Sequence, residues 1–336
     1  MRTLLLIVVM IAWALPAPAE ERLYDGDDVL PLTIHGPLAK LSRSAEDADD
    51  VPGHLELEDG TSIPMKFTKF GISRLRECGV PSLTITLDPD LVRGTVFEGQ
   101  RKLWLVTPCQ HHGSYDKYTL LEYLIYRSYA VIAEPALHAR LVSLRYRDTQ
   151  RRSSDRTEYA FILEDIGHAA ERTGRIWLDI PTQELPAFDP GQLATMGLFQ
   201  YMVGNTDWSA LAGPPGKRCC HNVALFGSDG PGSDAAVPHD FDRAGLVNPP
   251  YAVPSPKMKI RNVTQRLYRG FCFNNDQLPA AIEAFNDHRP EIEALFQRED
   301  LPYPDARRSA LKYLDGFYET INDPKKLKKR IIKHCR

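Results

Sequence analysis

Short segments that alternate polar and apolar residues recur between about residues 63 and 107. In one of them, Leu83, Ile85 and Leu87 fall on the same face, and a second such segment follows at 102–107. A period of two is typical of strands with one buried face. We therefore predict strands of an antiparallel sheet in this part of the chain.

A helical pattern replaces the alternation at residues 117–132, where the apolar positions form a single stripe. Asp189 and Pro190 supply an N-cap and a first-turn proline for another helix, which ends near Val203. The same reading predicts strands at 140–147, 158–164 and 221–226, and helices with proline punctuation beyond about residue 277.

These segments predict an α+β fold with a β-rich N-terminal half and a helical C-terminal half. The chain has 336 residues, of which 43% are apolar and 25% are charged. Such a composition is ordinary for a globular protein and excludes a wholly disordered or collagen-like chain. The length corresponds to one large domain or two modest ones.

The first nineteen residues have the features of a secretory signal peptide. Arg2 precedes an apolar run at 4–15, and the tripeptide Ala-Pro-Ala at 17–19 has the small-x-small form that signal peptidase accepts. We therefore predict a signal peptide at 1–19 and an exported protein, periplasmic or extracellular. No second run is long enough to cross a membrane, so no transmembrane span is expected after cleavage.

Charge is distributed unevenly along the chain. Residues 20–60 are acidic and turn-rich, which predicts an extended lead-in with one strand at 53–57, whereas the last twelve residues hold seven Lys and Arg and no acid. The formal net charge of −3 gives no support to a nucleic-acid partner. The basic tail at 323–336 is either a site for an anionic surface or a solvated helix end.

Six cysteines are present, at positions 78, 109, 219, 220, 272 and 335. An even number in an exported protein predicts three disulfides, and spacing does not choose among the pairings. We do not expect Cys219 and Cys220 to pair with each other, because a disulfide between adjacent residues needs a distorted peptide. No Cys/His set has zinc-finger spacing, so no structural zinc site is predicted.

Three short segments carry the candidate chemistry, at 204–209, 221–222 and 239–245. Each places an oxygen-bearing side chain at an element end or in a turn, where side chains can face a cleft. They offer Asp207, Asn222, Asp240 and Asp242, which are oxygen ligands suited to Mg²⁺ or Mn²⁺. A carboxylate base, then an amide ligand, then an Asp-Phe turn is the order of parts in a kinase-like phosphotransfer site.

Five segments carry a resemblance to a known family: EYLIYR at 122–127, FILED at 161–165, GNTD at 204–207, HN at 221–222 and PHDFD at 238–242. Over about residues 65–250 they resemble the corresponding parts of the spore-coat CotH family of secreted atypical kinases. They are also similar to uncharacterised exported bacterial proteins that share the same helix and Asp-Phe-Asp turn. The resemblance implies a two-lobed, protein-kinase-like fold and metal-dependent phosphoryl transfer from ATP.

Together with the resemblance, the sequence features predict an organisation of the chain. A signal peptide at 1–19, an acidic lead-in at 20–60 and a basic tail at 323–336 follow from the residues. The resemblance adds a β-rich N-lobe with one helix at 61–165 and a helical C-lobe with the catalytic loops at 166–322.

Residue roles follow from the resemblance. Asp207 would be the catalytic base, and the metal ions would be held by Asn222 and Asp240, with Asp242 as a further carboxylate. Glu122 would form an ion pair with a lysine that contacts phosphate. Glu164 and Asp165 would lie at the hinge beside the adenine. The lysine is left open among positions 66, 69 and 102, with Lys69 and Lys102 the stronger candidates.

The sequence departs from the kinase pattern because it has no Gly-x-Gly-x-x-Gly loop and carries Thr84 where a basic residue is expected. Two other functions therefore stay open: a catalytically silent exported binding protein, and a metal-dependent phosphoesterase that uses the same carboxylates. Asp207 could also simply stabilise its own turn. No Gly-x-Ser-x-Gly elbow, Rossmann fingerprint or P-loop is present.

Overall fold

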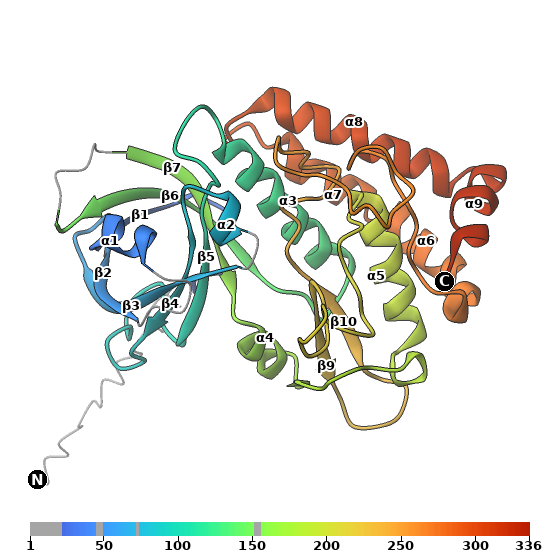
Figure 1. The fold of residues 1–336 in the computed structure, drawn as a ribbon, viewed down its shortest axis with the longest axis horizontal. Coiled ribbons are helices and arrows are strands. Elements are labelled where there is room, and N and C mark those ends of the chain that lie inside the picture. Colours follow the sequence, from blue (N-terminus) through green and yellow to red (C-terminus); the bar gives the residue numbers. More distant parts are fainter. Residues whose placement is uncertain (1–21, 45–49, 72–73, 151–155) are drawn as a thin grey trace, which may run out of the picture.

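The computed structural model describes residues 22–44, 50–71, 74–150 and 156–336. The chain first forms a β-barrel and then a mainly helical region that packs against one side of it (Figure 1). The predicted signal peptide at 1–19 lies outside the described residues. Within the described part, no helix is both long and apolar enough to cross a membrane.

Seven strands form the barrel, in the spatial order β1-β2-β3-β4-β5-β7-β6. Neighbouring strands are antiparallel except β1 and β6, which pair in parallel and close the sheet. The strands are β1 (Leu30–Gly36), β2 (Val51–Leu57), β3 (Ser62–Phe70), β4 (Ser82–Leu87), β5 (Lys102–Val106), β6 (Ala139–Asp148) and β7 (Arg156–Glu164).

The barrel corrects the predicted fold class. The predicted two-lobed, protein-kinase-like architecture is wrong, because the β-rich part is a closed barrel whose sheet is mixed and not purely antiparallel. Closure depends on β1 and β2, which lie in the segment predicted as an acidic lead-in at 20–60. The single acidic residue of these two strands, Glu56, lies on the outer face, while alternate apolar residues, such as Leu32, Ile34 and Leu55, are buried inside.

The apolar side chains on the predicted strand faces fill the interior of the barrel. Leu83, Ile85 and Leu87 are at most 4% exposed, which confirms that they share a buried face. Phe67 fills the end of the barrel beside Gly36 and Gly53: a Cβ at Gly36 would lie 2.4 Å from its ring. Only glycine at these two positions lets β1, β2 and the ring approach so closely.

The helical region follows the barrel in the chain and contains a small three-stranded sheet of order β10-β9-β8. That sheet consists of β8 (Ile176–Trp177), β9 (Val223–Gly227) and β10 (Ala235–Pro238). The helices of the described residues are α1 (Leu38–Arg43), α2 (Arg74–Glu77), α3 (Asp116–Ile132), α4 (Ile166–Arg172), α5 (Pro190–Val203), α6 (Leu278–Asp287), α7 (Arg289–Gln297), α8 (Pro304–Ile321) and α9 (Pro324–Arg330), with 3-10 turns at Leu185–Ala187, Cys272–Gln277 and Ile332–His334.

Helix α3 joins the two parts of the molecule. It contacts β6 and β7 of the barrel and α5, α7 and α8 of the helical region, and it is buried over most of its length. A helix covered on several sides needs apolar residues around much of its circumference, which is why the stripe at 117–132 is broad. The predicted helix at these residues is confirmed.

Helix α5 ends where the candidate site begins. The Asp189 carboxylate accepts a hydrogen bond from Gln192 N at 2.7 Å, and Pro190 opens the first turn, as predicted. The helix ends at Gly204, whose φ of +70° is left-handed. A Cβ there would lie 2.1 Å from the Tyr313 hydroxyl, so this position requires glycine.

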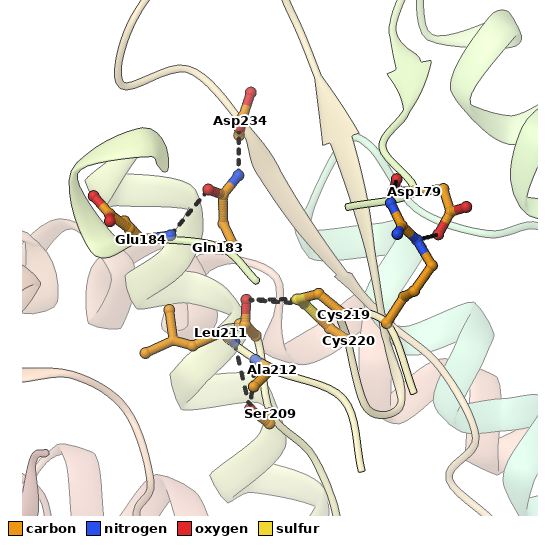
Figure 2. Close-up of a disulfide and its surroundings, with 11 residues drawn as sticks. Asp179, Gln183, Glu184, Ser209, Leu211, Ala212, Cys219, Cys220 and Asp234 are labelled. Atoms are coloured by element: carbon orange, nitrogen blue, oxygen red, sulfur yellow. Dashed lines mark hydrogen bonds and ion pairs between the residues drawn. A yellow bond between two sulfur atoms is a disulfide. The ribbon is translucent and has the colours of Figure 1, made fainter. Parts of the chain in front are cut away.

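Three disulfides join Cys78 to Cys109, Cys219 to Cys220 and Cys272 to Cys335. The expectation that Cys219 and Cys220 do not pair is therefore wrong (Figure 2). The peptide between them is cis, and it brings their Cα atoms to 3.0 Å, which puts the two sulfurs within bonding reach.

Candidate functional site

A pocket of about 440 Å³ lies between the barrel and the helical region. The barrel side contributes an apolar wall that includes Phe70, Trp104 and Leu163. The opposite side is polar and is formed by helix α3 and by the loops that follow α5 and β10. A second cavity, of about 350 Å³, lies against α1 and contains none of the predicted site residues.

Asp207 lines the pocket from the loop after α5. Its carboxylate oxygen Oδ1 lies 2.9 Å from His221 Nε2, and its backbone carbonyl accepts a hydrogen bond of 2.7 Å from the Asn222 amide. The hydrogen bond from His221 is the main cause that lowers the pKa of Asp207, and the same bond raises the pKa of His221. Asp207 is therefore ionised at neutral pH and held in place by the next predicted segment.

The turn that contains Asp207 is closed by the side chain of a neighbouring residue and not by Asp207 itself. Asn205 Oδ1 accepts a hydrogen bond from Asp207 N at 3.0 Å, so Asn205 closes the turn and the Asp207 carboxylate is left to face His221.

Asp240 follows β10 and lines the same pocket. Its backbone is left-handed, with φ +59°, and its N–H donates a hydrogen bond of 2.8 Å to the Tyr126 hydroxyl on α3. The Asp240 side chain is exposed to solvent inside the pocket, and the surrounding pocket walls are protein. This desolvation, followed by the nearby charge of Asp242, raises the pKa of Asp240 to about 7.

Asp242 and Glu122 lie behind Asp240 and are both buried. Asp242 Oδ2 is 3.5 Å from Arg74 Nη1, yet this oxygen accepts no hydrogen bond. Glu122 accepts a hydrogen bond from the backbone N–H of Phe241, and burial raises its pKa well above the usual range. Burial also raises the pKa of Asp242.

The cation that faces Glu122 is Arg74, where the sequence predicts a lysine. Arg74 comes from the short helix α2 and also donates to the backbone carbonyl of Thr107. A guanidinium carries its charge over several N–H groups, so it can serve Asp242 and Glu122 together. The ion pair of Arg74 is with Asp242, and its charge lowers the pKa of Glu122 only through space, so the predicted ion pair of Glu122 with a lysine stays a prediction.

The other predicted binding residues do not line the pocket. Lys69 donates to the carbonyl of Ser44 at 2.7 Å, and Lys102 forms an ion pair of 3.4 Å with Asp165 at the end of β7. Asp165 caps α4 by accepting hydrogen bonds from the N–H groups of Gly167 and His168.

Glu164 is fully buried and bonds to Arg172, His168 and the His138 N–H. Through these contacts the Glu164 carboxylate holds α4 and the turn before β6 against the barrel. The predicted hinge pair, Glu164 and Asp165, thus has structural contacts.

Several pocket residues were not predicted from the sequence: Arg74, Trp104, Tyr126, His221, His239 and Arg243. His221 stands beside Asn222, so the Asp-then-His-Asn order could have indicated it. Tyr126 lies within the EYLIYR segment, although its partner Asp240 was not indicated, and Arg74 carries no such signal; both act on partners more than 100 residues away in the chain.

The metal ligands predicted from sequence are brought near one another without forming a ready-made cage. The amide nitrogen of Asn222 donates a hydrogen bond to the Asp207 carbonyl, so the amide oxygen of Asn222 stays available to coordinate a cation. Among the described residues, the one group of three or more His, Cys, Asp or Glu with ligand atoms within 4.8 Å of one another is His35, His54 and Glu56 on the barrel. Asp207, Asp240 and Asp242 would need to move together to hold one ion.

No protein-family model matches this chain, and no curated protein matches it. The resemblance to the CotH family therefore stays a prediction. The pocket combines an ionised Asp207 paired with a histidine, a carboxylate with a pKa of about 7, two buried carboxylates beside one arginine, and an apolar wall opposite.

Proposed function

We propose that the pocket binds a divalent cation together with a phosphate-bearing ligand, and that it transfers a phosphoryl group from a nucleotide to an acceptor hydroxyl. Mg²⁺ or Mn²⁺ suits the oxygen donors of Asn222, Asp240 and Asp242, and ATP is the donor that the proposal assumes. The proposal is independent of the kinase-like architecture and depends on the contents of the pocket.

The observation that carries it is a shortage of positive charge. Glu122, Asp240 and Asp242 act on one another electrostatically, and Arg74 is the cation placed among them. Buried carboxylates without compensation are costly, and they respond by raising their pKa. A divalent cation would offset this negative charge, and the unbonded oxygen of Asp242 gives it a further acceptor.

The remaining residues support phosphoryl chemistry. Asp207 is ionised and lies at the pocket surface, so it can accept the proton of an attacking hydroxyl. Arg243, held by an ion pair with Glu77 at the rim, can neutralise phosphate charge. Phe70 and Trp104, whose ring centroids lie 5.5 Å apart, offer an apolar surface for a nucleobase.

Thermal unfolding with and without MnCl₂ and ATP tests cation binding. We expect the melting temperature to rise by about 5 °C at about 100 times Kd, because ligand binding to the native state adds about 2.7 kcal/mol. The Asp240→Asn variant should lose this rise. Asp229→Asn, the same exchange on an exposed hairpin, should retain it. An equal rise in wild type and Asp240→Asn would contradict the proposal.

Transfer itself is tested with nucleotide labelled at the γ-phosphate. We expect label on the protein or on an added acceptor, reduced at least about 100-fold in Asp207→Asn, since losing a group that acts in the transition state commonly costs that much. Cation binding without any label transfer would leave a silent binding protein, which is the alternative predicted from the missing glycine loop.

His221 favours a second candidate, a metal-dependent phosphoesterase. Its hydrogen bond to Asp207 raises the pKa of the imidazole, so a protonated His221 could donate its proton to a leaving alkoxide. A phosphoesterase would release phosphate from an alkyl phosphate such as glycerol phosphate without nucleotide, and His221→Gln would slow that release because the leaving alkoxide needs a proton. Turnover of the ester in the absence of ATP thus separates the two candidates.

We also propose that the protein acts outside the cytoplasm. Three disulfides form readily in an oxidising compartment and are rare in the cytosol. The tail carries exposed lysines, among them Lys325, Lys328 and Lys329. We propose that these lysines contact an anionic surface.

A further inference from the structure

A second group of metal-ligand side chains lies on the outer face of the barrel, away from the pocket. His54 and Glu56 are two residues apart on β2, so they project from the same face of that strand. His35 on β1 is the direct partner of His54 in the strand pairing. The three side chains therefore meet over two neighbouring strands, with Leu55 turned to the barrel interior between them.

The geometry of this group is unusual for exposed polar residues. The rings of His35 and His54 stack with centroids 4.1 Å apart and an interplanar angle of 14°. His35 Nε2 lies 2.9 Å from Glu56 Oε2, yet it is buried and makes no hydrogen bond. One ligand atom from each residue lies within 4.8 Å of the others.

The backbone beneath the group is well supported. Gly53 brings β2 close to β1: a Cβ at this position would lie 2.3 Å from the carbonyl oxygen of His35. Phe67 fills the space under both strands, and the closed barrel removes a free edge. Ligands on packed strands keep their spacing better than ligands on loops.

The neighbouring strands add few competing groups. On β6, Arg147 is opposite His35 and Arg145 is opposite Thr33; both are exposed, so solvent screens their repulsion of a cation. On β3, Pro64 is opposite His54 and Ser62 is opposite Glu56. Neither of these residues carries a charge.

We propose that His35, His54 and Glu56 bind a divalent transition-metal cation of the Zn²⁺ class, with a water molecule at the open fourth position. Two imidazole nitrogens and one carboxylate oxygen suit Zn²⁺, Cu²⁺ or Ni²⁺ and are a poor set for Mg²⁺. Ligand atoms on one tetrahedral Zn²⁺ are about 3.3 Å apart, given bonds of about 2.0–2.2 Å, so small side-chain rotations close the observed spacing.

Sequence motifs for metal sites depend on ligands that are close together in the chain, so they do not indicate this group. His35 and His54 are nineteen positions apart and become neighbours only through the β1–β2 register. The prediction that the chain has no zinc-finger pattern is compatible with it, because no cysteine takes part.

Calorimetric titration of the chelator-treated protein with ZnCl₂ tests the proposal. We expect one site per chain, weakened at least about 100-fold in His35→Gln, His54→Gln and Glu56→Gln, because even residues that only orient a ligand change affinity 10–100-fold. His112→Gln, an exposed histidine elsewhere on the chain, should bind as wild type does.

The Asp240→Asn variant separates this site from the pocket, since it should keep the Zn²⁺ affinity whatever the fate of the proposed function. Titration with Co²⁺ should give visible absorption bands of a four-coordinate ion that vanish in His54→Gln. Wild-type Zn²⁺ affinity in all three ligand variants, or no titratable binding to the wild-type chain, would overturn the proposal.

Discussion

Backbone conformation marks the pocket at the scale of single residues. Four non-glycine residues of the described chain have a left-handed φ: Asn222, Asp240, Asn248 and Tyr303. Two of these line the pocket. Such conformations are unfavourable for residues other than glycine, and they persist where the surroundings hold them in place. For Asp240 that support is the hydrogen bond to Tyr126, and for Asn222 it is the bond to the Asp207 carbonyl.

Glu164 illustrates a residue with a predicted binding role whose contacts are structural. Burial by itself raises its pKa, but hydrogen bonds from His168 and Arg172 outweigh this effect and lower the pKa to about 2. We expect Glu164→Gln to reduce the free energy of unfolding at neutral pH by about 2–4 kcal/mol, because Arg172 loses its buried partner. Urea unfolding measures this loss.

The pH dependence of that loss has a definite sign. Because the pKa of Glu164 is lowered on folding, its stabilisation is complete above the ordinary carboxyl value and disappears as the pH falls towards 2. The hydrogen bond to Glu164 raises the pKa of His168, so the stabilisation from His168 is lost as the pH rises through that raised value. The gap between wild type and variant should be widest near pH 5 to 6. Glu171→Gln, on the exposed side of α4, should leave stability unchanged.

At the scale of elements, the basic tail is part of the fold. Residues 324–330 form α9, which packs against α8, and Ile331 behind it is fully buried. Cys335 is bonded to Cys272, and the last residue exchanges backbone hydrogen bonds with the segment around Gly270. The tail is therefore anchored at both ends, and its lysines are presented on a fixed helix.

The disulfides differ in the length of chain that they close. We expect the double variant Cys272→Ser/Cys335→Ser to lose about 2–4 kcal/mol of stability, since this bond spans 63 positions and restricts a long loop in the unfolded chain. Cys219→Ser/Cys220→Ser is the matched control. Its residues are adjacent, so the loop closed is minimal and the entropic loss should be much smaller. Equal losses in urea unfolding would contradict this explanation.

At the scale of the whole molecule, the pocket depends on contacts between the barrel part and the helical part. Arg74, the first residue of α2, reaches Asp242 beyond β10, while Tyr126 on the joining helix α3 holds Asp240. A further bond joins Tyr303 at the start of α8 to Asp116 at the start of α3, and Asp116 also accepts from Tyr159 N on β7. The two parts are therefore joined by polar contacts as well as by the shared core.

Arg74→Met should show how much this joining cation contributes. Without the guanidinium, the buried carboxylates of Glu122 and Asp242 lose their nearest cation, and Asp240 beside them loses part of its compensation. We expect a loss of about 3–5 kcal/mol at pH 8. The loss should shrink as the pH falls, because protonation relieves carboxylates whose pKa is already raised.

Arg101→Met, at an exposed position before β5, serves as the control for Arg74→Met. Urea midpoints at several pH values give the comparison. A loss that is independent of pH would indicate that Arg74 acts through packing alone.

The sequence by itself determined the local elements and the segments that reach the pocket. The faces of Leu83, Ile85 and Leu87, the helix at 117–132 and the cap at Asp189 follow from periodicity and capping, which act over a few residues. Asp207, Asn222 and Asp240 were recognisable because each stands at the end of an element, and all three line one pocket.

Only the tertiary structure decided how distant segments pair. Closure of the barrel by β1 and β6, the ion pair of Arg74 with Asp242, the disulfide between Cys219 and Cys220 and the meeting of His35 with His54 were not predicted. Each depends on a distance in space or on a backbone geometry that local patterns do not encode. Many strand registers and ion-pair partners satisfy the same alternation of polar and apolar residues, and the packing of the whole chain selects one of them.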